Sequence, residues 1–359
     1  MKRENILREI TRIVVKLGTG VLTDSQKQPD LAQMGQLAAQ VSAIHDQGKE
    51  MVIVTSGAVG AGMGVLGFNR RPSELSELQA CAAVGQSRLM AIYERLFAQF
   101  GKHVAQVLLT HDDLEHHDRH LNARNTLVTL LQRKVIPIIN ENDAVSYTEL
   151  KFGDNDRLSA LVATLLPADL LAILTTVDGL MENYGQANSR VIPLVERIDP
   201  SLEKQAGGTT STTAVGGMAT KIQAAKIVVR SGIPLVIASG KKGDVLKRIL
   251  AGDEIGTWFV PRAQKMRGRK RWIAFFHHPK GMLVVDDGAK KALRDNGKSL
   301  LAPGIVRCEG QFQADDIVRL CDLDGTEFAR GIVQIASKDI QIGKKNRTEV
   351  IHRDNLVVV

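Results

Sequence analysis

Short apolar runs alternate with segments of helical periodicity along the first two thirds of the chain. Continuous apolar runs are typical of strands buried on both faces of a parallel sheet. They predict strands at 12–17, 51–54, 103–110, 135–139, 170–174 and 233–238. Apolar positions on one helical face predict helices at 31–47, 75–100 (one or two helices) and 121–133, and a further helix that ends near Gly232. This alternation predicts an α/β fold in which helices sandwich a mostly parallel sheet.

The pattern changes from residue 281 onward, where apolar runs become short and closely spaced. Strands are expected at 282–285, 317–323, 327–335 and 349–359, and Asp324-Gly325 is a strong hairpin-turn signal between two of them. We therefore expect a large α/β domain at 1–260, a basic connector at 261–280 and a small mainly-β domain at 281–359.

Net charge is concentrated at the C-terminal end. The chain has 47 Lys+Arg and 39 Asp+Glu, a formal charge of +8. Residues 257–359 hold 19 basic and 12 acidic residues (net +7), which leaves 28 and 27 (net +1) for the rest. Six cations fall between Arg262 and Arg271. Such a run suits either an RNA contact or a solvated connector, and the sequence leaves both open.

Hydrophobic content of 44% and charged content of 24% are ordinary for a chain that buries a core. The first residues have scattered charges and no apolar core, unlike a signal peptide. The most apolar stretch, 158–174, is interrupted by Pro167 and Asp169, and it is too short to span a bilayer. Three cysteines without metal or redox spacing suggest reduced thiols. These features predict a cytoplasmic protein with no membrane contact.

A dense polar cluster, 140–156, follows the apolar run 135–139. Open α/β sheets bind ligands at the carboxyl ends of their strands. The carboxylates of this cluster suit an ammonium group and its amides suit a carboxylate, so the cluster could hold a small zwitterion. The alternative is a solvated loop.

Two lysines stand in settings that suit an anion. Lys16 lies near the end of an apolar strand and before a glycine-bearing turn, where a phosphate is a natural partner. Lys221 follows the Gly- and Thr-rich stretch 207–217 in the expected first turn of a helix, whose N-terminus attracts anions. The alternative for Lys16 is a side chain that reaches the surface. The alternative for Lys221 is a lysine of a flexible surface loop with no role in binding.

Three weaker signals remain. Residues 55–64 form a small-residue loop that would let backbone approach a ligand. Gly62, Gly64 and Gly67 match a dinucleotide-binding pattern, but they come well after the strand tip, which disfavours a nicotinamide site. The histidine-rich run 111–120 invites a metal hypothesis, although a solvated turn or helix end explains it as well.

Several motifs together closely resemble the glutamate 5-kinases of the amino-acid kinase family. They are VVKLGTG at 14–20, VTSGAVGAG at 54–62, AAVGQSRL at 82–89, LNARNTL at 121–127, NENDAV at 140–145, KFGDND at 151–156 and GGMATK at 216–221. RKRWI at 269–273 and the following tail resemble the connector and PUA domain of the two-domain bacterial form. The resemblance implies ATP-dependent phosphorylation of the γ-carboxylate of L-glutamate, with Mg²⁺ bound to the nucleotide, at the first step of proline synthesis. It also implies feedback inhibition by L-proline. A homo-oligomer (dimer or tetramer) and a glutamyl-phosphate reductase partner are further expectations.

The resemblance also implies site residues. The catalytic positions fall on Lys16, Asp156 and Lys221, with Asp156 holding the two lysines in place. The residues alone also make Asp156 a candidate cap of a helix through Leu166. The expected glutamate site is Ser56, Gly57, Asn140, Asp143 and Asn155. The expected ATP site is Lys16, Thr175, Thr176, Val215, Gly216, Gly217, Met218, Ala219, Thr220 and Lys221. No residue is assigned as a metal ligand.

The sequence departs from its relatives at a few positions. Thr176 stands where Asp is common, Val215 where a small or hydroxyl residue is common, and Asp315 where a glycine is usual. Alternatives to a glutamate kinase are a family member acting on aspartate, acetylglutamate or a nucleotide, and an RNA-binding protein with a kinase-like body.

Overall fold

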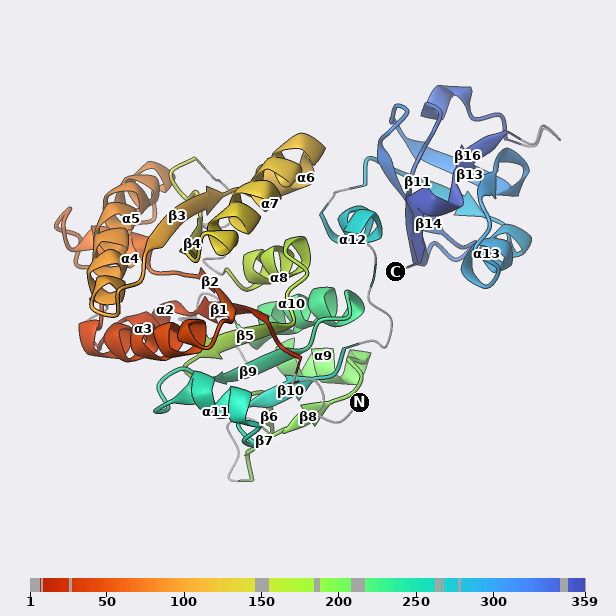
Figure 1. Cartoon of the computed structure of the whole chain (residues 1–359). Coiled ribbons are helices and arrows are strands. Elements are labelled where there is room, and N and C mark those ends of the chain that lie inside the picture. The colour runs from red at the N-terminus through yellow and green to blue at the C-terminus, as the bar shows by residue number, and fades with distance from the viewer. Residues whose placement is uncertain are drawn as a thin grey trace. The chain divides into compact units, whose positions relative to one another are not determined.

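A computed structural model describes residues 7, 9–25, 28–145, 155–183, 188–207, 217–261, 266, 268–276, 279–342 and 348–358. The chain divides into two compact units, Met1–Lys265 and Met266–Val359 (Figure 1). The division falls inside the segment expected as a connector. The finer boundaries proposed from the sequence stay a prediction.

The first unit is built on one large sheet, in which the described residues place eight strands in the order β3-β4-β2-β1-β5-β9-β10-β8. These strands are β1 (Arg12–Leu17), β2 (Glu50–Val54), β3 (Val104–Leu109), β4 (Ile136–Glu141), β5 (Leu170–Thr175), β8 (Leu194–Val195), β9 (Leu235–Ser239) and β10 (Thr257–Phe259). All neighbours are parallel except β9 and β10. The mostly parallel sheet is therefore confirmed, and β8 and β10 extend it beyond the expected strands.

Helices occupy the connections between these strands (Figure 1). They are α2 (Thr19–Leu22), α3 (Leu31–Asp46), α4 (Ala58–Met63), α5 (Leu75–Ala98), α6 (His111–Glu115), α7 (His117–Gln132), α8 (Asp156–Leu165), α9 (Pro200–Gly207), α10 (Met218–Arg230) and α11 (Val245–Ala251). The excursion expected after residue 181 contains the small hairpin of β6 (Met181–Glu182) and β7 (Arg190–Val191), then β8 and α9.

Side chains alternate along β1, so neighbouring residues lie on opposite faces of the sheet. Ile13, Val15 and Leu17 belong to the main core together with side chains of α3, α5 and α11. Lys16 is one residue out of phase with them, so it projects from the other face. Helix α8 contacts β1 and β5 and also packs against α10. The strand period thus directs Lys16 toward the layer formed by α8 and α10.

The small-residue stretch 55–64 is partly helical, which corrects the expected loop. Helix α4 follows Gly57, whose φ of +99° makes the sharp exit from β2. A Cβ added at Gly62 would lie 1.8 Å from the Cys81 carbonyl oxygen, and one added at Gly85 would lie 1.8 Å from the Ala58 carbonyl oxygen. The glycines are needed because α4 and α5 touch backbone to backbone.

The second unit contains a five-stranded sheet in the order β13-β11-β14-β15-β17 within its described residues. Its strands are β11 (Gly281–Val285), β13 (Ile305–Gly310), β14 (Ile317–Cys321), β15 (Glu327–Ile332) and β17 (Leu356–Val358). Around it lie α12 (Gly268–Phe275), α13 (Asp287–Arg294), the pair β12 (Leu300–Leu301) and β16 (Glu349–Ile351), and three 3₁₀ turns, η1 (Ala302–Gly304), η2 (Ser337–Asp339) and η3 (Arg353–Asn355).

Two local expectations hold in this unit and two change. The turn between β14 and β15 has Gly325 at φ +80°, as the hairpin signal predicts, and Asp315 adopts φ +71° at its usual glycine position. The single strand expected at 349–359 is two strands separated by η3. Helix α12 occupies part of the expected connector, because Ile273 and Ala274 are buried in a cluster with side chains of β14, β15 and β17.

We predict opposite effects for two glycine-to-alanine changes in helix interiors. Gly85→Ala should lower the free energy of unfolding by about 1–3 kcal/mol, because α4 and α5 must separate. Gly35→Ala in α3 should raise it by about 0.5–1 kcal/mol, because its Cβ would meet Leu96 at an ordinary 3.7 Å and alanine favours a helix. Urea unfolding followed by circular dichroism measures both. Equal stability of the two variants would contradict the close approach of α4 and α5.

Candidate active site

Three charged side chains from distant parts of the first unit meet at the start of α8. The Lys16 Nζ atom lies 2.8 Å from Asp156 Oδ1, and the Lys221 Nζ atom lies 2.9 Å from Asp156 Oδ2. Asp156 has no exposed surface, and each lysine is 4% exposed. The Thr220 hydroxyl donates a hydrogen bond to Asp156 Oδ2 at 3.0 Å. The sequence assigned these three charges to catalysis, and the structure brings them into contact.

The position of Asp156 differs from the helix cap that was also considered. Asp156 is the first residue of α8, Asn155 holds the N-cap position, and no side chain caps this helix. The Asp156 carboxylate is engaged by the lysines instead. When ionised, the two ammonium groups and the carboxylate carry a net charge of +1 in a buried setting. Two ammonium groups gathered at one point are suited to contact an anion such as a phosphate.

Backbone groups near the lysines suit a phosphate. Helix α10 begins after Gly217 with Met218, Ala219 and Thr220, and the start of a helix offers free N–H groups and a positive dipole end. This confirms the expected helical setting of Lys221. Two other residues of the expected ATP site, Val215 and Gly216, lie outside the described residues, as does most of the stretch 207–217.

The turn after β1 lies against the end of β5. The Gly18 N–H donates a hydrogen bond to the Leu174 carbonyl oxygen at 3.0 Å. A Cβ added at Gly20 would come within 2.8 Å of Thr176 Cγ2. Thr175 is the last residue of β5. The glycine turn that follows Lys16 and the expected nucleotide residues Thr175 and Thr176 therefore share one edge of the sheet.

A chain of side-chain amides extends from Asn155 away from the lysines. The Asn155 Nδ2 atom donates to the Thr55 carbonyl oxygen at 2.5 Å and to Asn140 Oδ1 at 2.6 Å. The Asn140 Nδ2 atom in turn donates to Gln86 Oε1 at 2.8 Å. All three amide residues are buried. Since Asn155 and Asp156 are adjacent in sequence, this amide relay is tied directly to the charged group.

A cavity of about 230 Å³ opens at the far end of the amide relay. Gln86, Glu141 and Asp143 supply polar groups to its wall, and small side chains such as Ala58 and Ala82 supply apolar surface. Burial raises the pKa of Asp143 to about 6, although the positive charge of Arg71 acts in the opposite direction. A carboxylate with this pKa gains from a cationic partner, as an ammonium group would provide.

Ser56 and Gly57 come just before the cavity-lining Ala58. The Ser56 hydroxyl is buried and has no hydrogen-bond partner among the described residues. Of the expected glutamate residues, the structure thus gathers Asn140, Asp143 and Asn155 around the amide relay and its cavity. Residues 146–154 of the predicted polar cluster lie outside the described part of the chain.

Sequence reasoning overlooked Gln86 and the buried Glu141. Gln86 lies within the motif AAVGQSRL, which served only as a mark of resemblance, and Glu141 directly follows Asn140. The histidine-rich run forms α6 and the start of α7. Thr110 and Asp113 make a capping box at the start of α6. In the described residues, no group of three or more His, Cys, Asp or Glu side chains is placed to hold a metal ion.

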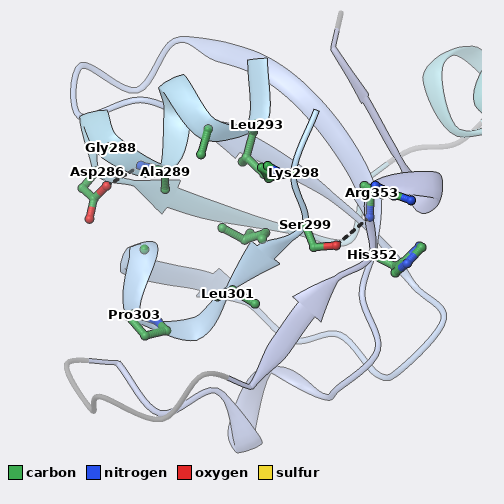
Figure 2. Close-up of a pocket in the computed structure, with 13 residues that line it drawn as sticks. Asp286, Gly288, Ala289, Leu293, Lys298, Ser299, Leu301, Pro303, His352 and Arg353 are labelled. Atoms are coloured by element: carbon green, nitrogen blue, oxygen red, sulfur yellow. Dashed lines mark hydrogen bonds between the residues drawn. The ribbon is translucent and has the colours of Figure 1, made fainter. Parts of the chain in front are cut away.

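The second unit has a separate cavity of about 750 Å³ between α13, β12 and η3. Its walls include the apolar side chains of Leu293 and Leu300, and its rim includes Lys298, His352 and Arg353 (Figure 2). The Ser299 hydroxyl accepts a hydrogen bond from the Arg353 N–H at 3.1 Å. Asp286 also lines this cavity, so its charged side chains are of both signs.

Comparison with known proteins agrees with this geometry. Residues 11–239 match the Amino acid kinase family and residues 281–354 match the PUA domain. A carbamate kinase from Giardia lamblia bound to AMP-PNP shares the fold of the first unit, with a TM-score of 0.51 and 19% identity over 70% of this chain and 99% of that one. The chain belongs to the amino acid kinase family.

Closer relatives narrow this assignment. The chain is 48% identical to the glutamate 5-kinase of Geobacter sulfurreducens, over 99% of this chain and 100% of the relative. It is 47% identical to that of Caldanaerobacter subterraneus, over 97% of this chain and 98% of the relative. Within the family, the chain is thus a member of the glutamate 5-kinase group. No helix among the described residues is long and apolar enough to cross a membrane.

We predict that the carboxylate of Asp156 is needed mainly to neutralise the buried lysines. Asp156→Ala should lower the free energy of unfolding by about 3–5 kcal/mol, because it leaves buried cations without their carboxylate. The double variant Asp156→Ala/Lys221→Met should regain part of this loss, because it removes one cation. Urea unfolding of both variants measures the difference. A double variant no more stable than Asp156→Ala would contradict the charge argument.

Proposed function

We propose that this chain transfers the γ-phosphoryl group of ATP to the γ-carboxylate of L-glutamate. The product is L-glutamyl 5-phosphate, and the reaction is the first step of proline biosynthesis from glutamate. The observation that carries the proposal is the buried Lys16–Asp156–Lys221 group, which is joined through Asn155 to an amide-lined cavity. One part suits phosphates and the other suits a zwitterionic amino acid.

The charged group binds the nucleotide phosphates in this proposal. Lys16 and Lys221 face the transferred phosphoryl group, and Asp156 keeps both ammonium groups in place. The N–H groups of Met218 to Thr220 at the start of α10 add hydrogen-bond donors. Mg²⁺ accompanies the nucleotide and neutralises phosphate charge. Thr175 and Thr176 at the end of β5 contact the rest of the nucleotide.

The amide relay and its cavity bind glutamate. Asp143 takes the α-ammonium group, because its partly buried carboxylate lacks part of the solvation that stabilises it in water. Asn140 and Asn155 are held in one orientation by their hydrogen bonds, so they are preorganised for a polar substrate. The Ser56 hydroxyl and the backbone at Gly57 offer donors for a carboxylate.

The chemical step requires positioning rather than a general base. A carboxylate with a pKa of about 4.3 is already ionised at neutral pH. Its oxygen attacks the γ-phosphorus, a new P–O bond forms, and the bond from phosphorus to the β–γ bridging oxygen breaks. ADP leaves with the electron pair of that bond, and no proton moves. Lys16 and Lys221 offset the repulsion between two anions and the charge on the transferred group.

Other expectations stay predictions. They are feedback inhibition by L-proline, a homo-oligomer, a glutamyl-phosphate reductase partner and a cytoplasmic location. RNA binding through the second unit also stays a prediction. Lys298 and Arg353 at its cavity are compatible with it, but Arg262, Lys265 and Arg267 of the basic run lie outside the described residues.

Hydroxamate formation tests the proposed reaction, because hydroxylamine traps an acyl phosphate. With Mg-ATP, we expect product from L-glutamate and none from L-aspartate or acetylglutamate. Lys221→Ala should lower kcat by about 10²–10³-fold with intact folding, on the scale of losing one transition-state contact. Lys226→Ala changes a partly exposed lysine of the same helix, paired with Glu203, and serves as the matched control. Absence of product from all three acids with folded protein would refute the proposal.

We predict that glutamate binding follows the ionisation of Asp143. The ammonium group binds the ionised carboxylate, so kcat/KM for glutamate should fall as pH drops through about 6. Below this pKa the loss should approach about tenfold per pH unit. In Asp143→Asn this ionisation should vanish and kcat/KM should be about 10–100-fold lower near neutrality. ADP release at saturating Mg-ATP measures the profile. An unchanged ionisation in Asp143→Asn would assign it to another group.

A further inference from the structure

The orientation of every amide in the relay follows from one backbone carbonyl. The Thr55 carbonyl oxygen can only accept, so the Asn155 atom 2.5 Å away must be Nδ2. The same Nδ2 atom lies 2.6 Å from Asn140, which must therefore present Oδ1. Asn140 then directs its Nδ2 atom toward Gln86, so the Gln86 atom that accepts this hydrogen bond must be Oε1. No flipped amide satisfies all three contacts.

This relay leaves one donor group of Gln86 without an acceptor among the described residues. Its Oε1 atom is occupied by Asn140, and its Nε2 atom is buried without a hydrogen-bond partner among the described residues. Gln86 is only 7% exposed, and it lines the 230 Å³ cavity. A buried donor without an acceptor is unfavourable, so the occupant of the cavity should supply an acceptor.

Asp143, one of several polar residues that line the cavity, indicates which acceptor this is. Asp143 lines the same wall and suits the α-ammonium group of the substrate. The α-carboxylate is attached to the same carbon as the ammonium, whereas the γ-carboxylate must reach the phosphoryl group beside Lys16 and Lys221. The acceptor within reach of both Gln86 and Asp143 is therefore the α-carboxylate.

We infer that Gln86, held by the Asn155–Asn140 amide relay, binds the α-carboxylate of the substrate. It thereby makes the enzyme selective for substrates that carry an α-carboxylate. The inference rests on the proposed function and adds a specificity residue to it. Small neighbours at Ala58 and Ala82 leave room for the carboxylate beside the amide. An amide donor recognises a carboxylate without adding a charge that would attract the phosphates of ATP.

The test compares substrates that differ by one group. L-Glutamate carries the α-carboxylate, and 4-aminobutyrate is the same molecule without it. Gln86→Met removes the donor, and with it the acceptor of Asn140 Nδ2, at nearly constant size. We expect kcat/KM for glutamate to fall about 10–100-fold, mainly through KM, because the carboxylate loses its donor. The value for 4-aminobutyrate should fall clearly less, since this acid does not use the Gln86 donor and is affected only through the lost contact of Asn140 with Gln86.

Two further variants complete the test. Gln99→Met makes the same chemical change at the exposed C-terminal end of α5 and should leave both substrates unaffected. Gln86→Glu preserves the acceptor for Asn140 and places an anion against the carboxylate, so glutamate use should fall further than in Gln86→Met. Gln86→Glu also replaces Gln86→Met in the test if Gln86→Met is too unstable to assay.

The outcomes separate this inference from the function on which it rests. An equal loss for both substrates, or an unchanged glutamate KM in folded Gln86→Met, would overturn the role of Gln86 and leave the kinase activity standing. Wild-type protein that phosphorylates neither acid would overturn the proposed function and the inference with it.

Discussion

The carboxylate of Asp156 between two lysines is the interaction on which the site depends. It has no exposed surface, and its partners come from β1 and α10, far from it in sequence. Charges buried this deeply are stable only in mutual contact, so the first turns of α8 and α10 must stay close to the end of β1. The same contact gathers two ammonium groups at one point. The group that orders the edge of the sheet is therefore also the group that attracts phosphate.

The position of Lys16 is also constrained by the sheet, because side chains along a strand alternate between its two faces. Val15 and Leu17 enter the core below α3 and α5, whereas Lys16 between them reaches the opposite layer. A shift of one residue in β1 would bury the lysine among apolar side chains, which is costly. Register in the central strand, set by the apolar residues, thus positions the charge that the reaction uses.

The parts of this arrangement that sequence reasoning predicted have strong local signals. Lys16 was found because a lysine near the end of an apolar strand needs an anionic partner. Lys221 was found because it follows glycines in the first turn of a helix, whose N-terminus attracts anions. Asp156 was also assigned as a helix cap, because an acidic residue is usual at the start of a helix. Local sequence does not show its ion pairs, because they join residues that are distant in sequence. Helix α4 was taken for a loop because glycines disfavour helices, and only its contact with α5 explains them.

Gln86 shows where local reasoning ends. In the sequence it is one polar residue within a helical pattern, and its hydrogen-bond partner Asn140 is 54 residues away. In the structure the amide relay links it to Asn155, the neighbour of Asp156. On the proposed function, the γ-carboxylate of glutamate meets the lysines, close to Asn155 at one end of the relay. The α-carbon groups meet Gln86 at its other end and Asp143 in the cavity wall. A fixed relay of packed amides sets the separation between these ends, so an acid one methylene shorter cannot satisfy both. Selection by length and selection by the α-carboxylate then have one structural origin.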